Sequence, residues 1–174
     1  AYITYRYARN IEDGLGLVYN TGERVEGFSS PLWLALMLAG PPLGLDYLEW
    51  SVFLSHGFLL AGAALALGLA MSQTPAARPI TCLVLASILV AHPQQCMLVT
   101  SGMEPLLSAF LLVCAIRTAS DRPVACAAVL LLAALNRPEG VAYALALACL
   151  LALRGRGSAR IVALLPAAGW AVSR

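Results

Sequence analysis

The sequence predicts an all-α fold, a polytopic transmembrane helix bundle whose first external loop carries two amphipathic juxtamembrane helices. Two observations support this prediction. First, 60% of the residues are hydrophobic and only 11% are charged, whereas soluble domains average about 25% charged residues. Second, residues 50–77 and residues 79–103 contain no Asp, Glu, Lys or Arg. Each stretch exceeds the roughly 18 to 20 apolar residues that are needed to cross a bilayer.

Residues 1–45 are expected to form the external loop. Within residues 1–14, apolar positions such as Tyr7 and Ile11 repeat at helical spacing between polar ones, which is typical of a helix lying at a membrane surface. A turn-rich link follows, and residues 31–43 then form a second apolar helix. This helix is too short to cross a bilayer, so we expect it to lie on the surface as well.

Residues 46–174 are expected to form the transmembrane bundle, with about six spans. The predicted spans are residues 47–71, 79–95, 104–118, 123–136, 139–153 and 160 to the end. The sequence does not begin with Met and stops just after an apolar run, so we expect both ends to be cut from a longer protein.

The connections between these spans alternate in charge, which predicts their orientation. One set carries Arg78, then Arg117 and Arg122, then Arg154, Arg156 and Arg160. The other set carries most of the acidic residues. Because Arg-rich loops stay in the cytoplasm, the acidic set should face the exterior or periplasm of a plasma-membrane protein. The net charge of +2 comes from Arg without any Lys and is spread between apolar runs, so no nucleic-acid partner is expected.

Three groups of charged residues at the predicted outer boundary are candidates for chemistry, and each has two readings. Glu23, Arg24 and Glu26 form either a solvated loop or part of a substrate site. Glu104, just before Pro105, either caps a helix or serves as a metal ligand or general acid/base. Arg137 either anchors to lipid or grips a substrate phosphate.

Two histidines are further candidates, because an ionisable side chain inside a membrane span is costly unless it has a function. His56 lies within the first long span and His92 near the outward end of the next. The alternative for His56 is a hydrogen bond to a neighbour on its own helix.

Three segments carry a resemblance to a known family. They are AYITYRYARNIEDGLGLVYNTGERVEGFSSPLW at residues 1–33, SGMEPLLSAFLL at residues 101–112 and NRPEG at residues 136–140. They resemble motifs of bacterial GT-C fold glycosyltransferases that use polyprenyl-phosphate sugars. The likeness is greatest to the actinobacterial arabinofuranosyltransferase and protein mannosyltransferase-like group, whose members act in cell-wall biogenesis.

The resemblance implies transfer of a sugar from a polyprenyl-phosphate donor to a cell-envelope glycan or lipid acceptor, on the outer face of the membrane. It places the catalytic base in an acidic pair directly before Ala1, so the chain as given is expected to be inactive alone. Glu104 matches the second acidic position, which helps to hold a divalent metal such as Mg²⁺ or Mn²⁺, or the donor phosphate. Ser29 fits a family position that is often Ser or Thr.

The sequence therefore yields a set of candidate site residues and a rival function. Glu104 is the candidate catalytic residue and possible metal ligand. The candidate substrate-binding residues are Arg6, Arg9, Glu23, Arg24, Glu26, Ser29, Arg137 and Glu139. The rival is a polytopic transporter or lipid flippase without glycosyl transfer, and a structural membrane subunit is a third alternative.

Overall fold

The computed structural model describes residues 2–23, 27–72, 75, 78–91, 93–119, 121–153 and 162, and within these residues the chain is all-helical. The helices are α1 (Tyr2–Glu12), α2 (Pro31–Met37), the short 3₁₀ helix η1 (Pro41–Leu43), α3 (Tyr47–Met71), α4 (Arg78–Ala91), α5 (Pro93–Thr100), α6 (Pro105–Thr118), α7 (Pro123–Asn136) and α8 (Glu139–Leu153). The predicted all-α class is confirmed.

Local sequence signals explain where these helices begin. Pro occupies the first position of α2, α5, α6 and α7, where its missing N–H and fixed φ cost nothing. α3 begins with a capping box: the Asp46 carboxylate accepts a hydrogen bond from the Glu49 N–H at 2.7 Å, and the Glu49 carboxylate accepts one from the Asp46 N–H at 3.2 Å. These pairs satisfy backbone donors that the first helical turn leaves free.

α3 is the helix of the described residues that is long and apolar enough to cross a membrane, with 25 residues. Four shorter apolar segments accompany it: Pro31–Leu43, Pro105–Thr118, Pro123–Asn136 and Glu139–Leu153. At a rise of about 1.5 Å per residue, the last three reach only roughly 21 to 23 Å, which is less than a hydrocarbon core of about 30 Å. Among the described residues there is thus one candidate span.

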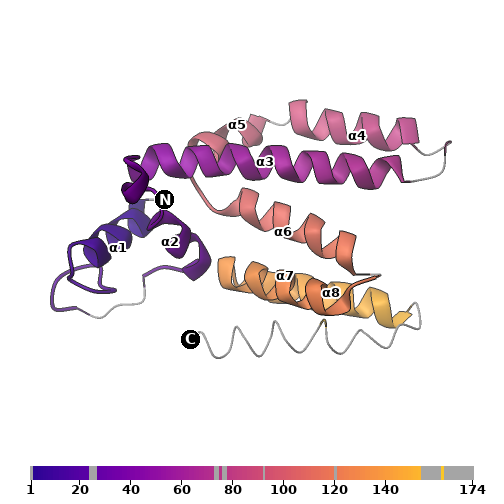
Figure 1. The fold of residues 1–174 in the computed structure, drawn as a ribbon. Coiled ribbons are helices and arrows are strands. Elements are labelled where there is room, and N and C mark those ends of the chain that lie inside the picture. The colour runs from indigo at the N-terminus through magenta and orange to yellow at the C-terminus, as the bar shows by residue number, and fades with distance from the viewer. Residues whose placement is uncertain are drawn as a thin grey trace.

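The helices form a layered bundle closed at one end by the N-terminal segment (Figure 1). α3 packs on α6, α6 on α7, and α7 on α8. α2 packs against both α1 and α7, and its side chains Trp33 and Met37 are fully buried together with Tyr7 of α1. α2 is therefore held inside the fold at this end, a placement that its composition did not predict.

Most of the predicted helix boundaries are confirmed, with one error. The predicted segments 47–71, 104–118, 123–136 and 139–153 match α3, α6, α7 and α8 to within one residue. The single helix predicted for residues 79–95 is wrong, because α4 ends at Ala91 and α5 begins at Pro93. Pro removes a backbone donor and disfavours helical geometry in the residue before it. The predicted last span, from residue 160, lies outside the described residues apart from Val162.

The connections of the bundle fall at its two ends. The end that α1 and α2 close also holds the start of α3, the loop before α6 and the turn between α7 and α8 (Figure 1). The opposite end holds the α6–α7 connection, where Arg117, Asp121 and Arg122 line a cavity of about 410 Å³. Glu104, Arg137 and Glu139 thus share one end of the fold, and Arg117 and Arg122 lie at the other.

Candidate functional site

Three charged side chains meet where α6 begins and α7 gives way to α8. The Arg137 guanidinium donates two hydrogen bonds to the Glu139 carboxylate, from Nη2 at 3.0 Å and from Nε at 3.3 Å. Its Nη1 lies 3.9 Å from Oε1 of Glu104. The hydrogen bonding of Arg137 to the Glu139 carboxylate is the largest of the influences that raise the pKa of Arg137. We call Glu104, Arg137 and Glu139 the charged cluster.

The Glu104 carboxylate is not used to cap α6. Glu104 occupies the N-cap position of that helix, yet its side chain makes no capping hydrogen bond. The residue is only 9% exposed, and burying a carboxylate is unfavourable unless a partner compensates it. Capping therefore does not explain Glu104, whereas its proximity to Arg137 does.

Asn136 holds the charged cluster together. Its side chain is fully buried, and Nδ2 donates to the backbone carbonyl of Glu104 at 3.1 Å and to Oγ of Ser108 at 2.8 Å. These bonds join the last residue of α7 to the first turn of α6. Arg137, the next residue along the chain, is thereby kept next to Glu104.

A cavity of about 370 Å³ opens beside the charged cluster. Its polar lining residues are Ser108, Arg137, Glu139 and Tyr143, and its apolar ones are Pro105, Ala109 and Leu112. The Arg137 side chain is 36% exposed, so its charge is accessible. We call this space the α6–α8 cavity; its lining suits a ligand with an anionic part and an apolar part.

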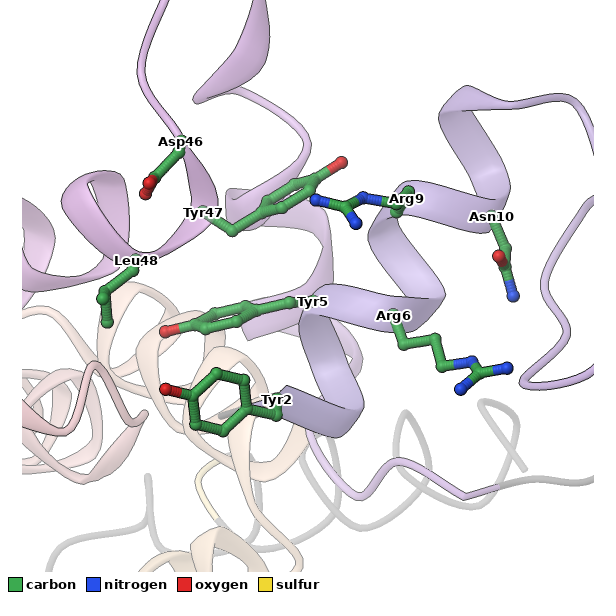
Figure 2. A pocket seen from close by; sticks show the side chains of 8 residues that line it. All are labelled: Tyr2, Tyr5, Arg6, Arg9, Asn10, Asp46, Tyr47 and Leu48. Carbon is green, nitrogen blue, oxygen red and sulfur yellow. The ribbon is translucent and has the colours of Figure 1, made fainter.

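A larger cavity of about 570 Å³ lies between α1 and the start of α3 (Figure 2). We call it the α1–α3 cavity. It is lined by Tyr2, Tyr5, Arg6, Arg9, Asn10, Asp46, Tyr47 and Leu48. Two predicted substrate-binding residues, Arg6 and Arg9, thus share one cavity.

The two arginines of the α1–α3 cavity are in different situations. Arg6 donates from Nε to the Tyr19 carbonyl and from Nη2 to Oδ1 of Asn20, both at 3.0 Å, and its guanidinium lies over the Tyr19 ring. Arg6 therefore fastens the following loop to α1. Arg9 makes no ion pair with any described residue, and its guanidinium extends beside the Tyr47 ring (Figure 2).

Tyr5 links the α1–α3 cavity to the loop that carries Glu104. Its hydroxyl lies 2.6 Å from Oγ of Ser51 on α3 and donates to the carbonyl of Gly102 at 3.2 Å. Burial raises the pKa of the Tyr5 phenol, so the hydroxyl remains protonated and able to donate. Gly102 has a φ of 60°, and a Cβ there would lie 2.1 Å from Oγ of Ser51. The contact therefore requires glycine.

The other predicted substrate-binding residues lie outside both cavities or outside the described residues. The Glu23 carboxylate accepts a hydrogen bond from Asn20 at 3.2 Å, which makes it part of the loop fastened by Arg6. Ser29 is exposed and lines neither cavity. Arg24 and Glu26 lie outside the described residues.

The two histidines and a possible metal site at Glu104 were also predicted as candidates for function. Nδ1 of His56 is hydrogen-bonded to the Val52 carbonyl one turn earlier, at 2.8 Å, which confirms the helix-neighbour interpretation. His92 lies outside the described residues. Nowhere in the described ranges do three His, Cys, Asp or Glu side chains gather as a metal site. The described surroundings of Glu104 do not by themselves fit Mg²⁺ or Mn²⁺, because its charged neighbour is a cation.

Sequence reasoning missed Ser51, Ser108 and Tyr47, and it assigned no buried hydrogen bond to Tyr5 or Asn136. Asn136 stands inside the NRPEG motif, so its position next to Arg137 was a usable signal. The pairing of Tyr5 with Ser51 joins residues 46 positions apart and has no local signature. Comparison with protein-family models, with curated proteins and with solved structures finds no match to this chain.

Proposed function

We propose that this protein is a membrane glycosyltransferase of the GT-C type, which moves a sugar from a polyprenyl-phosphate donor to a cell-envelope acceptor on the outer face of the plasma membrane. The observation that carries the proposal is the charged cluster at the mouth of the α6–α8 cavity. An accessible guanidinium next to an apolar wall matches the two halves of a lipid phosphate. The resemblance of residues 1–33, 101–112 and 136–140 to such enzymes points the same way.

In this proposal Arg137 binds the donor phosphate. Guanidinium forms paired hydrogen bonds with phosphate oxygens as readily as with a carboxylate, so a phosphate would replace Glu139 as its partner. Leu112, Ala109 and Pro105 would contact the first isoprene units of the donor. Glu104 would keep Arg137 oriented from the buried side, at its distance of 3.9 Å.

The chemical step is a substitution at the anomeric carbon of the donor sugar. The acceptor hydroxyl oxygen forms a bond to that carbon while the bond from the carbon to the phosphate oxygen breaks. The electron pair leaves with the phosphate, whose developing charge Arg137 stabilises. The hydroxyl proton passes to a general base, which the family resemblance assigns to the acidic pair ahead of Ala1.

The same proposal places the bundle across the membrane. α3 crosses it, α6 packs beside α3, and α7 and α8 follow in turn as further short spans. The end with Arg117 and Arg122 faces the cytoplasm by the positive-inside rule. The charged cluster, the α6–α8 cavity and the α1–α3 cavity then face the exterior or periplasm, where lipid-linked sugars are used.

The test is donor consumption by the full-length protein in proteoliposomes that contain polyprenyl-phospho-arabinose or polyprenyl-phospho-mannose. We expect turnover by the unchanged protein and a fall of about 100-fold or more for Arg137→Gln, because a group that stabilises developing charge is lost. Arg117→Gln, at the opposite end, is the matched control and should retain turnover. Full turnover by Glu104→Gln would remove Glu104 from the site, and no consumption of either donor would refute the proposal.

The second candidate is a lipid flippase. The same proteoliposomes distinguish the two functions. A flippase would move a fluorescent polyprenyl phosphate between leaflets without cleaving the bond to its sugar. Transfer of the sugar would identify the glycosyltransferase.

A further inference from the structure

We infer that the α1–α3 cavity binds a saccharide, and that this saccharide is the acceptor of the transferred sugar. The inference rests on the proposed function and narrows its acceptor from a glycan or lipid to a glycan. It stands on the aromatic wall, the mixed charges and the position of this cavity, which is separate from the α6–α8 cavity assigned to the donor.

Three tyrosine rings form one wall of the cavity (Figure 2). Tyr5 and Tyr47 are stacked, with centroids 5.9 Å apart and planes inclined by 13°, and Tyr2 meets Tyr5 edge-on at 5.8 Å. The Tyr5 hydroxyl is held by Ser51 and the Tyr47 hydroxyl donates to Glu12. Tyr5 and Tyr47 are therefore fixed before any ligand arrives, and Tyr2, which is 78% exposed, is the ring that a ligand can reach most freely. Such aromatic surfaces bury the apolar C–H faces of sugar rings at little cost in conformational entropy.

The polar residues of the cavity carry both signs of charge. Arg9 offers donors that no described residue uses in an ion pair. Asp46 offers a carboxylate, of which Oδ1 accepts the cap hydrogen bond from Glu49. Sugar hydroxyls donate and accept hydrogen bonds, so they can satisfy both groups. A purely anionic ligand would be repelled by Asp46. Arg6 would offer such a ligand little compensation, because its guanidinium already donates to the Tyr19 carbonyl and to Asn20.

The size and position of the cavity fit an acceptor. Its volume of about 570 Å³ lies within the range of roughly 300 to 1,000 Å³ that is usual for small-molecule sites. Tyr5, which lines it, also holds Gly102, two residues before Glu104. The saccharide would therefore lie at the same end of the bundle as the donor phosphate, with its far end free to leave the cavity.

The experiment measures the two substrates separately in full-length protein. The donor is the polyprenyl-phospho-sugar that the unchanged protein consumes, and the acceptor probes are synthetic trisaccharides of arabinofuranose and of mannose. Arg9→Gln and Tyr2→Ala change exposed side chains, so folding should be preserved, which circular dichroism checks. We expect each to raise the KM for the trisaccharide about tenfold, because Arg9→Gln removes a hydrogen bond from a charged group and Tyr2→Ala removes an aromatic contact. The KM for the donor should stay within twofold. Arg117→Gln is the matched control and should change neither constant.

The outcomes separate this inference from the proposed function. If Arg9→Gln and Tyr2→Ala leave the KM for both trisaccharides unchanged, or raise the KM for the donor instead, the α1–α3 cavity is not the acceptor site. If no donor is consumed, the proposed function fails, and saturation-transfer NMR then tests the cavity alone. Trisaccharide signals that Tyr2→Ala abolishes would support a saccharide site, and signals that persist unchanged, or no signals, would overturn it.

Discussion

The buried hydrogen bonds of Asn136 give the sharpest test of how the charged cluster is held. Asn136→Ala removes the bonds to the Glu104 carbonyl and to Oγ of Ser108, at 3.1 and 2.8 Å. Each buried bond contributes about 0.5 to 1.5 kcal/mol, and two acceptors lose their partner. The side chain is fully buried, so its removal also leaves a small void. We expect the free energy of unfolding to fall by about 2 to 3 kcal/mol.

The assay is equilibrium unfolding by denaturant in detergent micelles, followed by circular dichroism. Ser108→Ala, which removes one acceptor and leaves the other, should cost about 1 kcal/mol. Asn136→Ala together with Ser108→Ala should cost less than the sum of the two single changes, because both remove the same bond. A loss below about 0.5 kcal/mol for Asn136→Ala, the usual range of surface substitutions, would refute the reasoning.

Three further predictions concern close packing and pH. Gly102→Ala should lower the free energy of unfolding by about 2 kcal/mol, because φ is positive and the added Cβ would lie 2.1 Å from Oγ of Ser51. An unchanged melting temperature would contradict this prediction. Gly140→Ala should lower the melting temperature, since the added Cβ would lie 2.3 Å from the backbone of α7. Gly68→Ala, with open space around the added Cβ, should raise the melting temperature slightly. Equal shifts for the two variants would argue against close packing of α8 on α7 at Gly140. Above about pH 10 the unfolded state ionises Tyr5 before the folded state does, because burial raises the folded-state pKa. Above about pH 10 the free energy of unfolding should therefore decline less steeply with pH in Tyr5→Phe than in the unchanged protein. Identical slopes of unfolding free energy against pH in the two proteins would contradict this prediction.

Local signals explain why much of the helix pattern could be predicted. The charge-free runs located α3, and the apolar segments between charged turns located α6, α7 and α8. Pro105 and Pro123 mark two of the helix starts. The break at Pro93 was equally local but was outweighed by the surrounding hydrophobicity, so one long helix was predicted where α4 and α5 stand.

The candidate site was predictable only in part. Glu104, Arg137 and Glu139 stood out because charge is rare between long apolar runs, and the structure places all three together. Ser29 and Glu23 drew notice from the motif around them, yet neither lines a cavity. A resemblance of motifs does not indicate which side chains of a loop face inward.

The sequence by itself determined the helical class, most helix boundaries and the gathering of acidic connections apart from basic ones, because hydrophobicity, caps and proline act over one or two turns. Tertiary structure decided which residues meet. Tyr5 reaches Gly102 across 97 positions, and Asn136 reaches Glu104 across 32. Those contacts depend on how α1, α3, α6 and α7 cross and pack, and side-chain shape controls that packing only once the helices are brought together.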